Sequence, residues 1–167
     1  MTFSQTKSVN VKYVSEPITL DGILNELVWN EVEPATDFYN YFPTDSTIAK
    51  QQTEIKFLFD DTYLYVGMKV NSASNDYVVP SLRRDFRAGG SDNITLLFDT
   101  FNDGTNAFIF GTNPEGVQRE MLLSGGGTEL RGFTMAWDTK WRNETKIHED
   151  HYTTEWIIPL SAFKYRE

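Results

Sequence analysis

The sequence lacks cysteine and has only two histidines among its 167 residues. Without a thiol there is no cysteine nucleophile, no Cys-x-x-Cys redox pair and no cysteine zinc site. His148 and His151 lie in a polar stretch that we interpret as an exposed turn, because a zinc site usually needs a third protein ligand on a fixed scaffold. A Gly-x-Ser-x-Gly elbow, a phosphate-binding loop and a dinucleotide fingerprint are also missing. These absences exclude the common motif-defined classes of enzyme.

Positive charge is scarce, since 15 Lys and Arg residues stand against 24 Asp and Glu residues and give a formal net charge of -9. Such a surface repels phosphate backbones, so nucleic acid is not expected as a partner. No apolar run approaches the ~20 residues of a membrane-spanning helix, and residues 1–10 lack the apolar core of a signal peptide. We therefore expect a soluble chain.

Aromatic residues are abundant, at 14% of the chain. A chain of this length can bury a hydrophobic core without metal or disulfide support, so a single domain over residues 1–167 is predicted. Short stretches of alternating apolar and polar residues, broken by Gly, Asn and Asp, indicate antiparallel strands. The predicted strands are 53–59, 63–70, 93–99, 105–112, 117–123, 140–147 and 152–158. This pattern predicts an all-β fold, either an antiparallel sandwich or a barrel.

Local signals complete this prediction. In strand 63–70, Val66 and Met68 share one face and Tyr65 lies on the other. The Asp60–Thr62 segment predicts a tight turn in which the acids bind backbone amides. One short helix is predicted over residues 23–32, with Trp29 at the border of its apolar face, and a glycine-rich hairpin tip over 124–128. Trp29 and Trp156 are expected in the core.

Several segments resemble family 9 carbohydrate-binding modules, in the family's order along most of the chain. Residues 18–29 (ITLDGILNELVW) are similar to the opening strand, Asp-Gly turn and Trp-bearing helix, and residues 53–67 (TEIKFLFDDTYLYVG) to the next hairpin. Further similar segments are 84–85, 91–92 and 98–101 in an acidic middle part, and 137–138 and 154–160 at the end. The resemblance implies a jelly-roll or immunoglobulin-like sandwich.

The resemblance also implies a function and a setting. It predicts non-catalytic binding of a polysaccharide or oligosaccharide end in support of carbohydrate catabolism, by a monomer. Residues 110–116 (FGTNPEG) are similar to a branch found at the N-terminus of large bacterial surface proteins that continue into an outer-membrane barrel. We therefore expect a domain excised from a longer chain with a barrel or a catalytic domain after it. Its expected location is periplasmic, outer-membrane-associated or extracellular.

Sugar recognition needs exposed aromatic planes and side chains that form paired hydrogen bonds. Trp137 and Trp141 flank a polar turn and are the predicted stacking residues, with Arg84 and Asp85 as polar partners. The family's sugar site resembles a slot between two tryptophans. The first half of this chain has no second candidate tryptophan, and the stretch 37–43 carries Phe and Tyr instead, of which Tyr41 is the predicted substitute.

Two questions stay open at this stage. Asp92, Asp99 and Asp103 are candidate ligands for the structural calcium that the resemblance implies, and the alternative is a set of solvated turn acids with an ion pair from Arg84 to Asp85 or Asp99. No spacing singles out two carboxylates as a glycosidase pair, so the domain itself is not expected to be an enzyme. The alternative function is a structural or interaction domain of an outer-membrane protein that binds no sugar.

Overall fold

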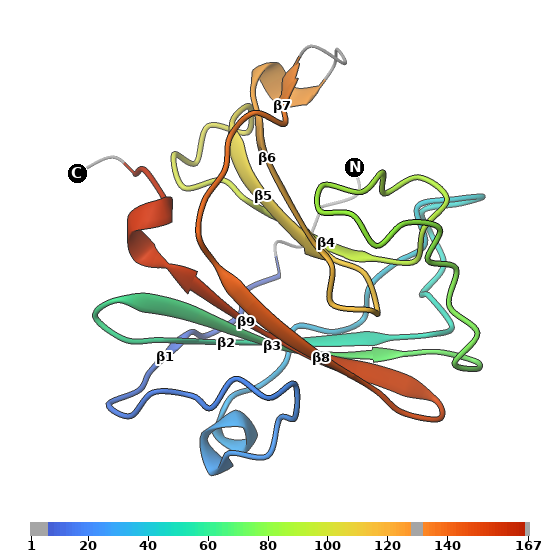
Figure 1. Cartoon of the computed structure of the whole chain (residues 1–167), viewed down its shortest axis with the longest axis horizontal. Helices are drawn as coiled ribbons and strands as arrows, with labels where there is room; N and C mark the ends of the chain where they lie inside the picture. Colours follow the sequence, from blue (N-terminus) through green and yellow to red (C-terminus); the bar gives the residue numbers. More distant parts are fainter. Residues whose placement is uncertain (1–6, 128–131, 166–167) are drawn as a thin grey trace.

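The structure is a computed structural model that describes residues 7–127 and 132–165, and it is a sandwich of two β-sheets (Figure 1). The five-stranded sheet has the order β1-β2-β3-β9-β8 and the four-stranded sheet the order β4-β5-β6-β7. The strands are β1 (Lys12–Tyr13), β2 (Thr53–Phe59), β3 (Tyr63–Asn71), β4 (Ile94–Phe98), β5 (Ala107–Thr112), β6 (Gln118–Leu123), β7 (Phe133–Thr134), β8 (Arg142–Ile147) and β9 (His151–Pro159). All neighbours are antiparallel except β1 and β2. The predicted all-β sandwich is confirmed.

The β2–β3 hairpin shows how closely local sequence dictates this fold. Asp60 accepts hydrogen bonds from the backbone amides of Thr62 and Tyr63 at 2.7 and 2.6 Å, as the turn prediction required. Its other carboxylate oxygen accepts a bond of 2.6 Å from the hydroxyl of Tyr65. A single acid therefore closes the turn and anchors the strand that follows it.

The main core lies between the two sheets. Strand alternation places Val66 and Met68 inside and Tyr65 on the opposite face, as predicted. The buried members of this core are Ile55, Val66, Met68, Phe108, Phe110, Trp141, Trp156 and Ile158. Trp156 confirms its predicted place, and its indole donates a hydrogen bond of 3.2 Å to the Thr112 hydroxyl. Even the polar end of this ring therefore has a partner.

A second core covers the outer face of the five-stranded sheet. Residues 14–32 lie beneath that sheet in Figure 1 and pack Val14, Ile18 and Trp29 against it. Gly67 makes this approach possible, because a Cβ there would lie 2.9 Å from ring atoms of Trp29 and 2.7 Å from Leu24. The five-stranded sheet is thus buried on both faces, which explains why Trp29 is core as predicted.

The predicted helix over 23–32 is a short 3-10 helix instead, η1 (Leu27–Glu31). Asp21 uses its side chain to bind the amide of Ile23 at 2.9 Å, which forms a turn before any helix begins. The short 3-10 helix that follows buries Trp29 against the sheet, where only 1% of the residue stays exposed.

Two remaining observations concern the rest of the described chain. No helix in residues 7–127 and 132–165 is both long and apolar enough to cross a membrane. The predicted glycine-rich tip contains the 3-10 helix η2 (Gly125–Gly127), whereas Thr128 lies outside the described residues.

Candidate functional site

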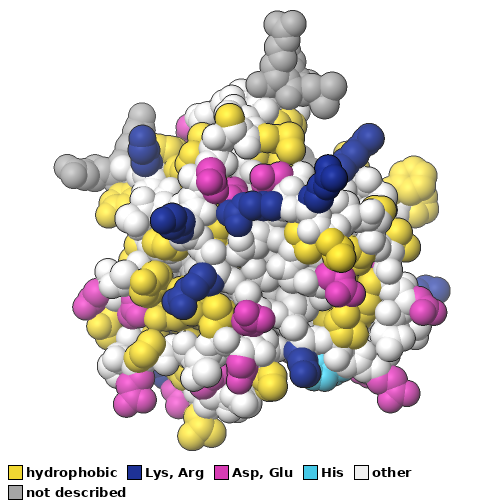
Figure 2. All heavy atoms as spheres, in the orientation of Figure 1, with side chains coloured by type: hydrophobic (Ala, Val, Ile, Leu, Met, Phe, Trp, Pro, Cys, Tyr) yellow, Lys and Arg dark blue, Asp and Glu magenta, His cyan; other side chains and the backbone are white. Residues whose placement is uncertain are grey.

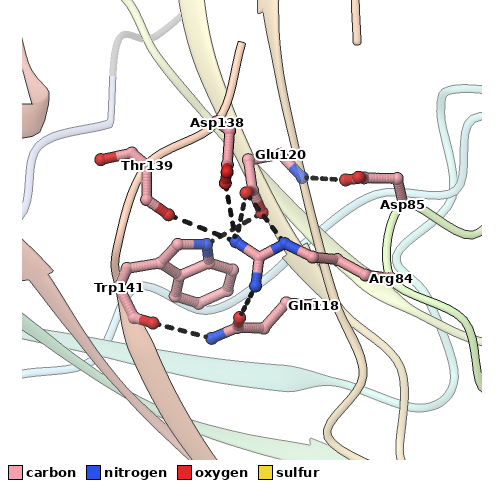
Figure 3. Close-up of polar contacts among 7 residues, drawn as sticks. All are labelled: Arg84, Asp85, Gln118, Glu120, Asp138, Thr139 and Trp141. Carbon is pink, nitrogen blue, oxygen red and sulfur yellow. Dashed lines mark hydrogen bonds and ion pairs between the residues drawn. The ribbon is translucent and has the colours of Figure 1, made fainter. Parts of the chain in front are cut away.

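Arg84, Asp85, Trp137 and Trp141, four of the five residues predicted to bind a ligand, lie near one another at the edge of the four-stranded sheet. We call the polar group there the Arg84 cluster; it comprises Arg84, Asp85, Gln118, Glu120, Asp138, Thr139 and Trp141 (Figure 3). Its members come from the loop before β4, from β6 and from the segment before β8. Tertiary structure therefore joins three segments that are far apart in sequence.

The guanidinium of Arg84 is the centre of the cluster. Its Nε and Nη2 donate to Glu120 Oε1, and Nη1 donates to the amide oxygen of Gln118. Nη2 also lies 3.2 Å from the carbonyl oxygen of Thr139 and 3.4 Å from Oδ1 of Asp138. The side chain of Arg84 is 43% exposed, so part of this charge faces solvent.

Glu120 is the buried counterpart of Arg84. It lies on the same inward face of β6 as Leu122, and its side chain is fully buried. The indole Nε1 of Trp141 donates to Oε2 of Glu120 at 3.1 Å. Burial raises the pKa of Glu120, while the hydrogen bonds from Trp141 and Arg84 favour its charged form. The pair carries an ionic contact from the core to the surface.

Asp85 positions this arrangement through the backbone. Its amide donates to the carbonyl oxygen of Gln118 at 2.9 Å, and its Oδ1 accepts a bond of 3.1 Å from the Glu120 amide. The residue has a φ of 58°, a left-handed conformation that Asp tolerates better than most residues. The Arg84–Asp85 segment is thereby fixed to the edge of β6. Arg84 pairs with Glu120 and Asp138 rather than with Asp85 or Asp99, so the predicted ion pairs are wrong.

Trp141 is not at an exposed rim, and this part of the prediction is wrong. Its side chain is only 5% exposed and packs edge-on against Phe110 and Trp156, at centroid distances of 5.3 and 5.1 Å. The indole is drawn inward because Glu120 offers a buried acceptor for its N–H. A sugar ring therefore has no free face of Trp141 on which to stack.

Trp137 is half-buried and lines a cavity of about 340 Å³. Phe108 and Leu122 form apolar parts of this cavity, while Asn106 and Lys164 supply polar groups. We call it the Trp137 pocket. Its volume is at the lower end of the range typical of small-molecule sites. Trp137 and Trp141 both pack against Phe110, at centroid distances of 5.6 and 5.3 Å, so the indole of Trp137 lies close to the Arg84 cluster.

Tyr41 lies elsewhere, in a hairpin over residues 37–49 that is joined to the sandwich ahead of β2. The Tyr39–Ile48 bridge forms this hairpin, and Tyr41 is 96% exposed near its tip. Within residues 7–127 and 132–165, no side-chain hydrogen bond, ion pair or ring contact joins Tyr41 to the Arg84 cluster. The structure therefore does not place Tyr41 opposite Trp137 or Trp141 as the second wall of a slot.

The three candidate calcium ligands do not form one donor set. Asp99 and Asp103 are neighbours, because the Asp103 amide donates to Asp99 Oδ1 at 3.3 Å, but Asp92 binds the Val78 amide instead. Asp103 also accepts bonds from the side-chain amide of Asn106 and from the backbone amides of Thr105 and Asn106, and these bonds hold the pKa of its carboxyl far below the usual range. Within residues 7–127 and 132–165, no group of three or more His, Asp or Glu could hold a metal ion. Calcium binding stays a prediction.

Sequence reasoning missed Glu120, Gln118 and Asp138. The sequence held one signal. Strand alternation places Glu120 on the same face of β6 as Leu122, so this charged side chain points into the interior and needs a partner there. Nothing local pointed to Arg84 as that partner, since the two residues are 36 positions apart. Chemically, the site offers the half-exposed guanidinium of Arg84, the exposed carboxylate of Asp138 and the nearby indole of Trp137. Hydroxyl groups of a neutral ligand suit such donors and acceptors.

Comparison with known proteins agrees with this architecture. No protein-family model matches the sequence, and no curated protein does. A family 9 carbohydrate-binding module from Caldicellulosiruptor kristjanssonii in complex with glucose superposes with a TM-score of 0.60 at 19% identity, over 91% of this chain and 70% of that one. The fold is similar to that of a family 9 carbohydrate-binding module.

Two more solved structures support the same conclusion about the fold. A family 9 module from C. kristjanssonii in complex with cellotriose gives a TM-score of 0.56 at 20% identity, over 91% of this chain and 68% of that one. A candidate carbohydrate-binding protein from Bacteroides uniformis gives a TM-score of 0.58 at 16% identity, over 93% of this chain and 75% of that one. The expected family 9 fold is thus confirmed by structures of low sequence identity.

Proposed function

We propose that this domain is a non-catalytic carbohydrate-binding module that takes a neutral sugar at the Trp137 pocket and the adjacent Arg84 cluster. The observation that carries the proposal is this pairing of a half-buried indole with a solvent-facing guanidinium and carboxylate. An indole stacks on the CH face of a sugar, while Arg84 and Asp138 offer a donor and an acceptor for hydroxyl groups.

The fold supports the proposal. Two solved structures with a similar fold, both of a family 9 module from C. kristjanssonii, contain glucose and cellotriose, which are neutral sugars. Charge also supports a neutral ligand. Within the Arg84 cluster, the carboxylates of Glu120 and Asp138 outnumber the cation Arg84, and the chain as a whole carries a formal charge of -9, so an acidic sugar would meet net repulsion at the cluster.

The experiment is a melting panel of soluble neutral oligosaccharides followed by titration calorimetry of any sugar that raises the midpoint. Asp138→Ala and Trp137→Ala are expected to weaken binding about tenfold or more, because each removes one recognition contact. Asp61→Ala is the matched control, since this exposed acid lies in the turn between β2 and β3, outside the Trp137 pocket and the Arg84 cluster. A flat panel, or variants that bind as tightly as the parent, would overturn the proposal.

A second candidate is a structural or interaction domain without sugar binding. The observation in its favour is that Trp29, Trp141 and Trp156 are all buried, so no second tryptophan is available to face Trp137. This candidate predicts that no sugar in the panel changes the melting midpoint. The same experiment therefore separates the two functions.

A further inference from the structure

The hairpin over residues 37–49, which we call the aromatic hairpin, is ordered by its own hydrogen bonds. The Asn40 amide donates to the Thr47 carbonyl at 2.8 Å, and the Ala49 amide donates to the Phe38 carbonyl at 2.9 Å. The side chain of Gln52 binds both the amide and the carbonyl of Phe38, at 3.0 and 3.1 Å. The backbone at the base of the hairpin is therefore fixed.

The side chains at its tip are nevertheless almost entirely in solvent. Tyr41 is 96% and Phe42 84% exposed, and Phe38, Tyr39 and Ile48 are exposed as well. Figure 2 shows hydrophobic side chains that project from the right edge of this face, at the end where the hairpin lies in Figure 1. Each aromatic side chain offers roughly 150–250 Å² of contact area. A cluster of this kind marks an interaction site more often than chance exposure.

The shape of the tip limits what it binds. Because Tyr41 and Phe42 are 96% and 84% exposed, they do not enclose a small molecule. They project instead, which suits contact with an extended partner. Because the hairpin is already ordered, such contact costs little conformational entropy in the backbone.

Charge limits the partner further. Segment 37–49 has the acids Asp37 and Asp45 and no Lys or Arg of its own, and one cation lies against it, since Lys7 Nζ is 5.7 Å from the centre of the Tyr39 ring. The surface therefore has no excess of positive charge. Anionic lipids and nucleic acids attract basic surfaces, so both are poorly matched to this segment. An uncharged polysaccharide brings no repulsion, and its apolar ring faces are suited to stack on Tyr and Phe. Hydroxyls of Thr44 and Ser46 in the same turn add hydrogen-bonding capacity for sugar hydroxyls.

We propose that the aromatic hairpin is a second carbohydrate-binding surface, which lies against the face of an uncharged, insoluble polysaccharide. It is separate from the Arg84 cluster and the Trp137 pocket. The inference rests on the proposed function in taking carbohydrate as the ligand, but it assigns a different surface and a different physical form of that ligand.

The test is a depletion assay with washed microcrystalline cellulose, and in parallel with chitin and insoluble xylan. The Tyr41→Ala/Phe42→Ala double variant is expected to lose at least about tenfold in affinity for the polysaccharide that retains the parent. Its melting midpoint should not change, because both side chains are exposed. Leu27→Ala is the matched control, since Leu27 is an equally exposed apolar residue on another element, η1.

Titration with soluble oligosaccharides separates this inference from the proposed function. The double variant should bind soluble sugars as the parent does, whereas Asp138→Ala should not. Equal retention of parent and double variant on the polysaccharide, or no retention of the parent, would overturn the inference even if soluble sugars bind. Two other results would also overturn it. If the parent binds neutral phosphatidylcholine vesicles and the double variant does not, the partner is a membrane. If the parent is a dimer on size-exclusion chromatography and the double variant is a monomer, the partner is a second copy of the chain.

Discussion

The carboxylate of Glu155 accepts a hydrogen bond of 3.2 Å from the indole Nε1 of Trp29, 126 residues away in sequence. Its other oxygen accepts bonds of 3.0 and 2.9 Å from the amides of Asp21 and Gly22. One buried acid on β9 thus holds both the Asp-Gly turn and the tryptophan of the N-terminal segment against the five-stranded sheet. Glu120 and Trp141 repeat this pairing on the other sheet.

Glu155 predicts a pH-dependent stability. Burial raises its pKa from 4.5 to about 7, although the amides of Asp21 and Gly22 favour the anion. Because the folded pKa lies above the unfolded one, the folded state holds the proton more tightly between these values. The contribution of Glu155 to the free energy of unfolding is therefore greatest below about pH 4.5, falls as the pH rises to about 7, and is constant above it. The total loss is at most about 3 kcal/mol.

Urea unfolding of the parent and of Glu155→Gln across about pH 5 to 8 measures this effect. Glutamine has the same shape and does not titrate, so the slope between pH 5 and 7 should become shallower in the variant. If both proteins lose stability in parallel over this range, Glu155 is not the titrating group.

Gly67 predicts a steric effect in the same region. A Cβ at this position would lie 2.7 Å from Leu24 and 2.9 Å from Trp29, so Gly67→Ala should force the N-terminal segment off the sheet. Overpacking of this kind costs about 1–3 kcal/mol of unfolding free energy, measured by urea denaturation. Gly89→Ala serves as the control, because its Cβ would meet only Arg87 at 3.9 Å. Equal stability of the two variants would contradict the packing described here.

Arg84 predicts an energetic coupling with Glu120. Arg84→Ala leaves a fully buried carboxylate without its cation, which should destabilise the fold by about 2–4 kcal/mol after allowance for the half-exposed guanidinium. In a Glu120→Gln background the same change should cost much less, because the buried group is then neutral. A double-mutant cycle by urea unfolding gives the coupling, and additive effects would show that the ion pair contributes nothing to stability.

A substitution of Asp103 distinguishes a role as calcium ligand from a role as turn cap. Its carboxylate accepts the amides of Thr105 and Asn106, both at 2.8 Å, so Asp103→Ala should lower the melting midpoint. If the acid acts only as a cap, the loss is the same with calcium and with chelator. If calcium instead raises the melting midpoint of the parent, and Asp103→Ala and Asp99→Ala each abolish this rise, the metal site is established.

Local sequence determined most of the architecture. The strand alternation around Val66, the Asp60 turn and the burial of Trp29 and Trp156 are consequences of side-chain polarity over a few neighbouring residues, and the structure has each of them as predicted. The family resemblance supplied the sandwich, which structures of low sequence identity share.

Only the tertiary structure decided which side chains reach solvent and which polar groups meet. Trp141 turns inward because Glu120, 21 residues away, provides a buried acceptor, and Arg84 joins them from 36 residues away. Tyr41 stands apart on a hairpin that the sequence alone did not separate from the sheet. Strand alternation is a local property, whereas the pairing of buried charges depends on which strands become neighbours. The sequence therefore determined the sandwich, and the assembly of its segments decided the site.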